Sequence, residues 1–269
     1  MKARFGFLDV FSVGVFAFLY LPLLCVVMFS VNASRLGLQW GGFTLHWYAD
    51  LFRDELIQRA ALNTLFLAVV STVISTVLGT CLALGIQRHH WPKRTGKMLE
   101  ILLNIPIVTP DIIFAVALVI AFSALRLVSS LFELGMPTMI IGHVAFQISF
   151  VALVIRGRLQ MIGQDLEEAA FDLYAEYPRM LWTVVIPLLK PAILAGAALA
   201  FTLSLDDFVI SFFTAGPKSI TLPIYIYAAV HRGVTPEIHA LSTLVMLMTI
   251  AAVTLMQWMT RHSDKEIKA

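Results

Sequence analysis

Long apolar segments recur along the chain, separated by short polar stretches. A helix of roughly 20 mostly apolar residues crosses the ~30 Å hydrocarbon core of a bilayer. Six segments reach that length, over residues 8–31, 60–86, 99–125, 138–159, 191–213 and 241–260. The pattern therefore predicts an all-α integral membrane protein with six transmembrane helices, organised as a single transmembrane domain over residues 1–269.

Composition agrees with this prediction. Of the 269 residues, 59% are hydrophobic and only 13% are charged, whereas soluble domains carry about 25% charged residues. The net charge of +2 gives no reason to expect nucleic acid as a partner, so the partner indicated by composition is the lipid membrane. Cys25 and Cys81 both fall inside apolar runs, where a thiol is usually a small hydrophobe. We expect no metal site.

The distribution of basic residues predicts the orientation. An even number of spans places both termini on one side of the membrane. That side and its loops hold thirteen basic residues: Lys2, Arg4, Arg88, Lys93, Arg94, Lys97, Arg156, Arg158, Arg179, Lys190, Arg261, Lys265 and Lys268. The opposite side holds six: Arg35, Arg53, Arg59, Arg126, Lys218 and Arg232. Basic residues favour cytoplasmic loops, so we expect cytoplasmic N- and C-termini and a cytoplasmic loop over residues 160–190.

That loop contains a charged stretch, QDLEEAAFDLYAEYPRM, unlike the rest of the chain. Asp165 followed by Glu168 is typical of an N-cap with an acid at N3, and predicts a helix start. Pro178 should end the helix, and Pro187 and Pro191 should break the chain again before the fifth span. The predicted helix has a small apolar face and an acidic face, formed by Asp165, Glu168, Asp172 and Glu176. An amphipathic helix at the membrane surface is one interpretation, but such helices are usually basic, so the acidic face favours a protein partner.

The pattern of Glu168, Ala169, Ala170, Asp172, Leu173 and Ala175, followed by Ile186, Pro187 and Pro191, resembles the EAA loop of ABC importer permeases. The resemblance implies a type I ABC importer permease fold. It also implies that residues 168–175 form a coupling helix that docks into a cleft of a cytoplasmic ATPase. The family's usual glycine after the leucine is Tyr174 here, which leaves open that the chain continues as a helix where the family bends.

Several sequence patterns of catalysis are absent. No GxxxxGK[ST] phosphate loop occurs, so nucleotide that drives transport must bind another polypeptide. HExxH and GxSxG are also missing, and we interpret His143 and Ser149, in the fourth span, as interhelical hydrogen-bonding residues. We expect no catalytic residue and no cofactor on this chain, with ATP and Mg on a partner ATPase.

Acidic residues inside the predicted spans are the candidates for a substrate pathway. An Asp near the bilayer centre costs ~2.5 to 3.5 kcal/mol, so it indicates a functional site by default. Asp206 and Asp207 lie ~22 Å from the cytoplasmic end of the fifth span, and Asp111 lies ~18 Å along the third, at ~1.5 Å per residue. Successive helical residues point ~100° apart, so we expect at most one of the adjacent pair to face the path. Asp111 has a second interpretation, as part of the start of a half-helix capped by Thr109 after a break at Pro106.

Five further segments, over residues 34–52, 109–113, 203–213, 221–227 and 233–241, resemble the permeases of spermidine/putrescine ABC importers. The resemblance implies a bacterial inner-membrane subunit that translocates polyamines. It also implies a homologous second permease, two cytoplasmic ATPase subunits and a periplasmic polyamine-binding protein as partners.

Three alternatives remain at this point. One is an ABC permease for another small cationic or amine solute. Another is an ion-coupled secondary transporter using the same acids, which would leave the acidic cytoplasmic helix unexplained. The third is an intramembrane aspartyl protease using Asp111 and Asp207, although the GxGD context of such enzymes is absent.

Overall fold

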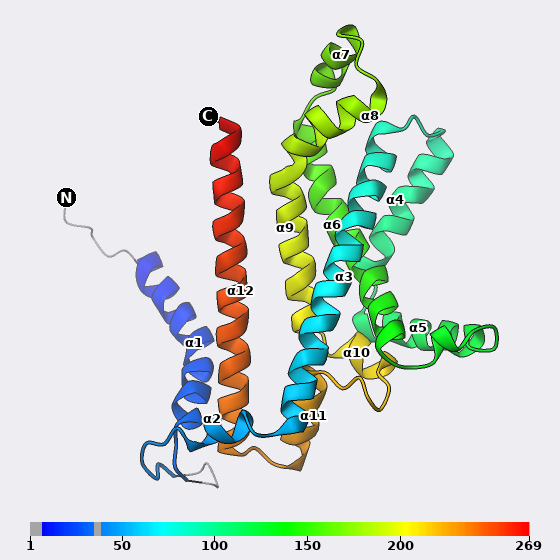
Figure 1. The fold of residues 1–269 in the computed structure, drawn as a ribbon. Coiled ribbons are helices and arrows are strands. Elements are labelled where there is room, and N and C mark those ends of the chain that lie inside the picture. The colour runs from blue at the N-terminus through cyan, green and yellow to red at the C-terminus, as the bar shows by residue number, and fades with distance from the viewer. Residues whose placement is uncertain (1–6, 35–38, 269) are drawn as a thin grey trace, which may run out of the picture. The chain divides into compact units, whose positions relative to one another are not determined.

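The computed structural model describes residues 7–34 and 39–268, and within them the chain is almost entirely helical (Figure 1). In chain order the elements are α1 (Phe7–Ser30), α2 (His46–Leu51), α3 (Glu55–Arg88), α4 (Lys93–Val108), α5 (Asp111–Leu125), the 3-10 turn η1 (Ser130–Phe132), α6 (Met136–Met161), α7 (Asp165–Asp172), α8 (Tyr177–Met180), the π-helical turn η2 (Leu181–Val185), α9 (Ile186–Leu205), α10 (Val209–Thr214), α11 (Leu222–Arg232) and α12 (Pro236–Lys268). The predicted all-α class is confirmed. Lys2, Arg4 and Arg35, used above to orient the chain, lie outside the described residues.

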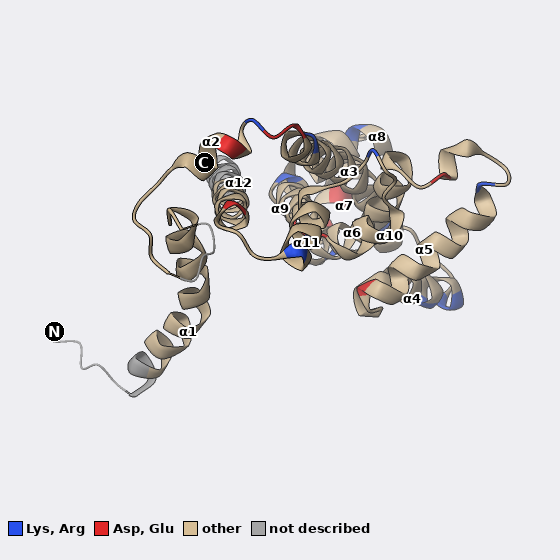
Figure 2. Cartoon of the chain, turned by 90° about the horizontal axis from the view of Figure 1, so that it is seen from below, with Lys and Arg blue, Asp and Glu red and all other residues tan. Residues whose placement is uncertain are grey.

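Within the described part of the chain, four helical segments are long and apolar enough to cross a membrane: Phe11–Ser30, Glu55–Arg88, Met136–Met161 and Tyr177–Leu205. The bent pair α4 and α5 makes a fifth if it is counted as one span. The start of α12 adds a shorter apolar helix, Pro236–Ala251. Figure 2 shows that Lys, Arg, Asp and Glu occupy only short stretches of the ribbon. A multi-pass protein is therefore supported, and six spans remain a prediction.

The third predicted span is discontinuous, as expected, but its break lies elsewhere. We placed the break after Pro106, yet Pro106 lies inside α4, and the chain bends by 110° between α4 and α5, at Thr109 and Pro110. The cause is local, because a residue before proline is pushed out of the helical region, and Thr109 has ψ 129°.

The fifth span also differs from its predicted bounds of 191–213. A helix runs from Tyr177 to Leu205, and the break follows it, before α10. We predicted that Pro187 would break the chain before this span, and this was wrong. The carbonyl four residues earlier belongs to Thr183 in η2, where the wider π turn leaves room for the proline ring. Pro191 lies inside α9.

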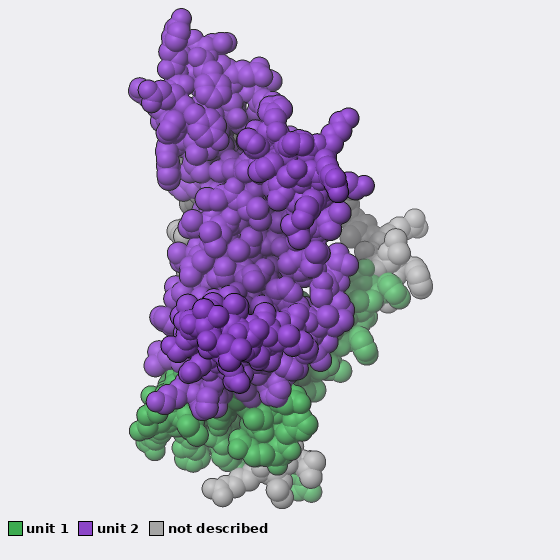
Figure 3. Space-filling view, turned by 90° about the vertical axis from the view of Figure 1, so that its right-hand side faces the viewer, with its two compact units in different colours: residues 1–59, 225–248 green, residues 60–224, 249–269 purple. Residues whose placement is uncertain are grey.

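The chain divides into two compact units, coloured separately in Figure 3: unit 1 is residues 1–59 and 225–248, and unit 2 is residues 60–224 and 249–269. In unit 2, α6 packs along α9 and against α4 and α10, and α5 packs on α10. Small residues allow close crossings: a Cβ on Gly79 of α3 would lie 2.8 Å from the Val151 side chain of α6. The single-domain organisation stays a prediction.

In unit 1, Asn32 organises the loop after α1. Its side chain is fully buried, donates to the Gln39 carbonyl (2.9 Å) and accepts from the Gly41 amide (2.8 Å). The Trp47 indole donates to the Asn32 carbonyl (2.9 Å). These bonds fix the start of α2 against the end of α1.

Candidate functional site

Asp207 holds the break between α9 and α10. Its Oδ1 accepts from the Ile210 amide (3.2 Å) and its Oδ2 from the Ser211 amide (2.8 Å). These amides belong to the first turn of α10, which has no intrahelical acceptors for them, and a carboxylate suits the positive end of the helix. The Asp207 side chain is only 14% exposed. Geometrically, Asp207 acts as a cap.

The His143 side chain, on α6, contacts α9, α10 and the turn between them. Its Nδ1 lies 2.8 Å from Ser204 Oγ on α9, while its Nε2 lies 3.0 Å from Ser211 Oγ on α10 and 3.2 Å from Asp207 Oδ2. The imidazole is 1% exposed. The interhelical role predicted for His143 is confirmed. The same role predicted for Ser149 was wrong, because its hydroxyl makes no hydrogen bond to another helix within the described residues.

Further hydrogen bonds extend this contact to α3. Ser75 Oγ donates to Gln147 Oε1 (3.0 Å), and the hydroxyls of Ser71 and Ser204 are 3.2 Å apart. We call the set the polar seam; its members are Ser71, Ser75, His143, Gln147, Ser204 and Ser211. Sequence reasoning found only His143. Ser71 and Ser75 are four residues apart, as are His143 and Gln147, so each pair lies on one face of its helix. This spacing is a sequence signal by which the polar seam could have been predicted.

Asp206 differs from its neighbour. It follows the last residue of α9, its side chain is exposed, and no cation pairs with its carboxylate among the described residues. An intramembrane carboxylate rarely faces lipid and usually faces a protein or a water-filled cavity. Within the described residues Asp206 is therefore exposed and without a cation, while Asp207 is occupied.

Asp111 is the first residue of α5 and is also exposed. The predicted cap on Thr109 was wrong, because the Thr109 hydroxyl donates back to the Ile105 carbonyl (2.7 Å) and Pro110 occupies the N-cap position. Within the described residues no hydrogen bond joins Asp111 to Asp206 or Asp207. The negative charge of Asp111 lies at the positive end of the α5 dipole.

The predicted coupling loop folds as the short helix α7, a bend, and then α8, which is the first turn of the continuous helix Tyr177–Leu205 rather than a separate short piece (Figure 1). Two further details were wrong. Gln164 precedes the helix without a side-chain cap bond, so Asp165 is the first helical residue rather than the N-cap. The helix also ends at Asp172, before Pro178, which instead lies in the first turn of α8.

The bend at Tyr174 is retained without glycine. Tyr174 has φ +60°, its amide bonds the Phe171 carbonyl (2.9 Å) and the Ala175 amide bonds the Ala170 carbonyl (3.0 Å). This pair of bonds is a Schellman motif, whose left-handed position is usually glycine. The alternative of a continued helix is therefore wrong.

The coupling residues fall into two groups. Ala170 and Ala175 are partly buried, and both pack against the core that includes Leu159 and Met180. The remainder are exposed: Glu168, Ala169, Asp172, Leu173 and Tyr174. Leu173 and Tyr174 are 81% and 96% exposed, which leaves an apolar and aromatic tip available to a partner.

One ion pair links this segment to α3. Arg88 Nε lies 2.7 Å from Glu167 Oε1, and the side chains are only 10% and 11% exposed. Glu167 was not singled out from the sequence, because only the acids of the acidic face were considered, and these were assigned to a protein partner. Charge patterning alone gives no sign of a partner so distant in the chain.

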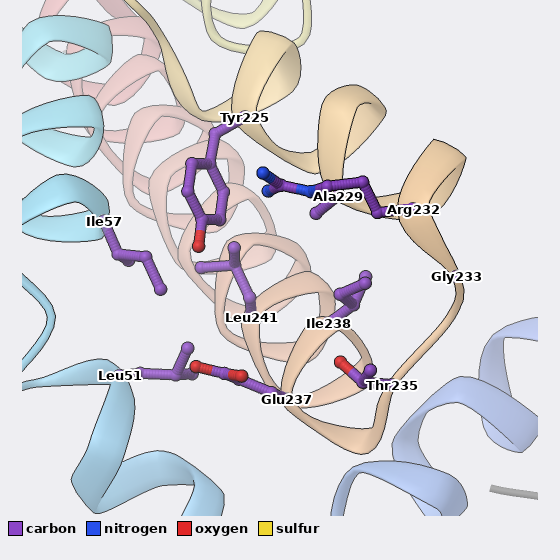
Figure 4. A pocket seen from close by; sticks show the side chains of 10 residues that line it. All are labelled: Leu51, Ile57, Tyr225, Ala229, Arg232, Gly233, Thr235, Glu237, Ile238 and Leu241. Carbon is purple, nitrogen blue, oxygen red and sulfur yellow. The ribbon is translucent and has the colours of Figure 1, made fainter. Parts of the chain in front are cut away.

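A small cavity of about 210 Å³ lies within unit 1 (Figure 4). Tyr225 and Arg232 extend into it from α11, and Glu237 from α12. Burial, and then the negative charges of Asp54 and Glu237, raise the pKa of the Tyr225 phenol, while Arg232 opposes them. The phenol therefore stays a neutral hydrogen-bond donor. The sequence did not predict this pocket.

The model of the family described as "Binding-protein-dependent transport system inner membrane component" matches residues 75–269. The chain belongs to this family. The permease is 33% identical to the spermidine/putrescine transport system permease protein PotC of Escherichia coli, over 95% of this chain and 94% of that protein. It is 36% identical to the putrescine transport system permease protein PotI of the same species, over 94% and 90%.

The fold is shared with a bacterial ABC transporter for import of the acidic polysaccharide alginate. The TM-score is 0.76, the sequence identity is 18%, and the match covers 93% of the permease and 92% of that chain. Membership of the ABC permeases decides against the secondary-transporter and protease alternatives. The permease is a transport subunit of an inner membrane and not itself catalytic.

Proposed function

We propose that this permease is the membrane subunit of an ATP-driven importer that carries spermidine and putrescine. The observation that supports this substrate is the identity of 33–36% over at least 94% of the chain to permeases named for these polyamines. The structural neighbour named for alginate shares only 18% identity, and supports the fold alone.

The proposed complex has a homologous second permease, two cytoplasmic ATPase subunits that hold ATP and Mg, and a periplasmic polyamine-binding protein. This chain contributes six spans, the sixth within α12, with both termini in the cytoplasm. The family description supports the binding protein. The missing phosphate loop supports a separate ATPase, and the excess of basic residues supports the orientation.

Asp206 is the residue we assign to the substrate pathway. A polyamine carries several ammonium groups, and an exposed carboxylate without a competing cation offers each of them a weak, releasable site. Asp207 contributes by holding the break that presents Asp206. Asp111 is exposed and adds negative charge from α5, so it is assigned to the same path with a supporting role.

The coupling segment has a direct connection to Asp206. The exposed residues Glu168, Ala169, Asp172, Leu173 and Tyr174 would contact the ATPase. The helix Tyr177–Leu205 begins just after them and ends next to Asp206, a length of ~43 Å at ~1.5 Å per residue. Movement of the coupling segment is thereby carried along one helix to the proposed substrate site.

The test is uptake of labelled spermidine and putrescine by transport-deficient cells that carry the whole system. A matched strain carries the same system with an ATPase subunit unable to hydrolyse ATP. We expect uptake only with the active ATPase. Uptake that is equal in both strains would reject the ATP-driven mechanism. A complex that assembles and hydrolyses ATP but carries neither polyamine would reject the substrate, and favour another small cationic or amine solute.

A further inference from the structure

A groove of about 560 Å³ lies in unit 2, beside the ion pair of Arg88 and Glu167. It is formed by the last turns of α3, the chain that follows it, and the segment from α8 into η2. Its lining includes Leu84, Arg88, His89, Trp91, Tyr177 and Leu181. No transport role proposed above uses this groove.

The groove is apolar along the helices and polar at the end of α3. Leu84 and Leu181 line its apolar part, while Arg88 and His89 supply basic groups. Trp91 and Tyr177 are 41% and 54% exposed at the same place. Aromatic and basic side chains at the end of a transmembrane helix are typical of the boundary between hydrocarbon and lipid headgroups.

Within the described residues, two donors of the Arg88 guanidinium, Nε and Nη2, have no hydrogen-bond partner. Its side chain is nine-tenths buried, and its Nε lies 2.7 Å from Glu167 Oε1. Its Nη2 is buried and has no hydrogen-bond partner. Leaving a donor of a charged group unpaired away from water is costly, because the lost hydration is not replaced. An acceptor from outside the chain that reaches the guanidinium through the groove, after a small shift of the side chains that cover it, would remove this cost.

We propose that this groove binds an anionic phospholipid. The phosphate oxygens accept hydrogen bonds from the Arg88 guanidinium, whose planar donors suit a phosphate. One acyl chain lies along Leu84 and Leu181, and Trp91 and Tyr177 flank the headgroup. A phospholipid satisfies both halves of the groove, and the surrounding membrane supplies it at high concentration.

The site also has a regulatory consequence. The guanidinium that would bind the phosphate is the one that holds Glu167, the buried acid of α7. Lipid bound there fixes Arg88 in place and so favours the docked position of the coupling segment. The inference does not depend on which solute the permease carries.

Gly85 allows a test that leaves the ion pair intact. Gly85 lines the groove, and a Cβ at this position would meet no atom within 4 Å. Gly85→Leu therefore adds a side chain at the groove from a position where the Cβ itself meets open space. Gly157→Leu is the matched control, because Gly157 on α6 is equally open and does not line the groove.

The experiment uses the full chain in its assembled complex, placed in bilayer discs of phosphatidylcholine with a minor share of phosphatidylglycerol. Retained lipid is measured by mass spectrometry after extraction into mild detergent. We expect selective retention of phosphatidylglycerol, about tenfold weaker after Arg88→Gln, since one charge-assisted hydrogen bond is worth about that factor. Gly85→Leu should weaken retention of this lipid similarly, because its side chain occupies the groove. Gly157→Leu and Arg94→Gln should retain it as the unmodified chain does.

Glu167→Gln separates lipid binding from the ion pair. It removes the charge of Glu167 but keeps Arg88, so phosphatidylglycerol retention should persist. Equal retention by Gly85→Leu and Gly157→Leu would overturn the proposal. A loss of complex assembly in Gly85→Leu, without a change in retained lipid, would show that a protein subunit occupies the groove. Displacement of the lipid by millimolar inorganic phosphate would show a site for free phosphate instead.

Discussion

Tyr174 occupies a backbone conformation that glycine adopts at lower cost. At φ +60° its Cβ is close to the following carbonyl, which costs about 1 to 2 kcal/mol for a non-glycine residue. Because the side chain is 96% exposed, its removal loses little packing. Tyr174→Gly should therefore stabilise this chain, purified without its partner subunits, by about 1 kcal/mol, measured by thermal unfolding.

Leu173→Gly is the control for this prediction. Leu173 is 81% exposed but has φ −86°, so glycine relieves no strain there and only adds freedom to the unfolded chain. We expect a small loss of stability. Equal effects of the two substitutions would contradict a strained Tyr174.

The adjacent acids Asp206 and Asp207 should respond differently to removal of charge. Asp207→Asn weakens the bonds to two amides of α10 and the contact with His143, and should lower stability by about 1 to 3 kcal/mol. Asp206→Asn should leave stability within about 0.5 kcal/mol. It should nevertheless reduce polyamine uptake roughly tenfold, the effect of losing ~1.4 kcal/mol of interaction with the substrate.

Thermal unfolding and uptake are both measured for each variant at equal expression. The pathway assignment of Asp206 would be rejected if Asp206→Asn transported at the unmodified rate. Stability unchanged in Asp207→Asn would reject its role as a cap.

At the scale of helices, the close crossing of α3 and α6 depends on Gly79. A Cβ there would lie 2.8 Å from Val151 Cβ and 3.2 Å from the Ile148 carbonyl oxygen. Gly79→Ala must push the helices apart, and should destabilise the protein by about 1 to 3 kcal/mol in thermal unfolding. Gly85→Ala, on the same helix but facing open space, should instead gain up to about 1 kcal/mol. A Gly79→Ala variant as stable as Gly85→Ala would contradict this close crossing.

Helices were predicted from the sequence more reliably than the places where they break. Apolar length is enough to find α1, α3 and α6, because each span must satisfy its own backbone hydrogen bonds in lipid. For the other helices, the positions of proline led to wrong predictions of where the helix breaks. Pro106 and Pro191 lie inside helices, whereas the turn at residues 206–208 has no proline and depends on contacts of Asp207 with α10 and His143.

The candidate site was predicted only as a set of residue types. The acids were found because charge is rare in apolar spans, but which of Asp206 and Asp207 is occupied depends on Ser211 and His143, which come from other positions in the fold. Arg88 and Glu167 were missed for the same reason. Long-range pairing of this kind leaves no periodic pattern in one sequence.

At the scale of the whole molecule, the orientation can be tested directly. Thirteen basic residues on the side of the termini, against six on the other, predict that a fluorescent protein fused after Ala269 folds in the cytoplasm. Alkaline phosphatase fused at the same position should be inactive, while a fusion within residues 216–221 should be active. The reverse pattern would place the coupling segment on the side without ATP and overturn the proposed mechanism.

The left-handed backbone conformation of Tyr174 also affects how related chains are recognised in genomes. A search pattern that requires glycine at this place would pass over this chain, although its backbone makes the same turn with the same two hydrogen bonds. Other transport operons with a bulky residue there would be overlooked in the same way. A search written in terms of a short helix, one residue of positive φ and the start of a long apolar helix would recover them.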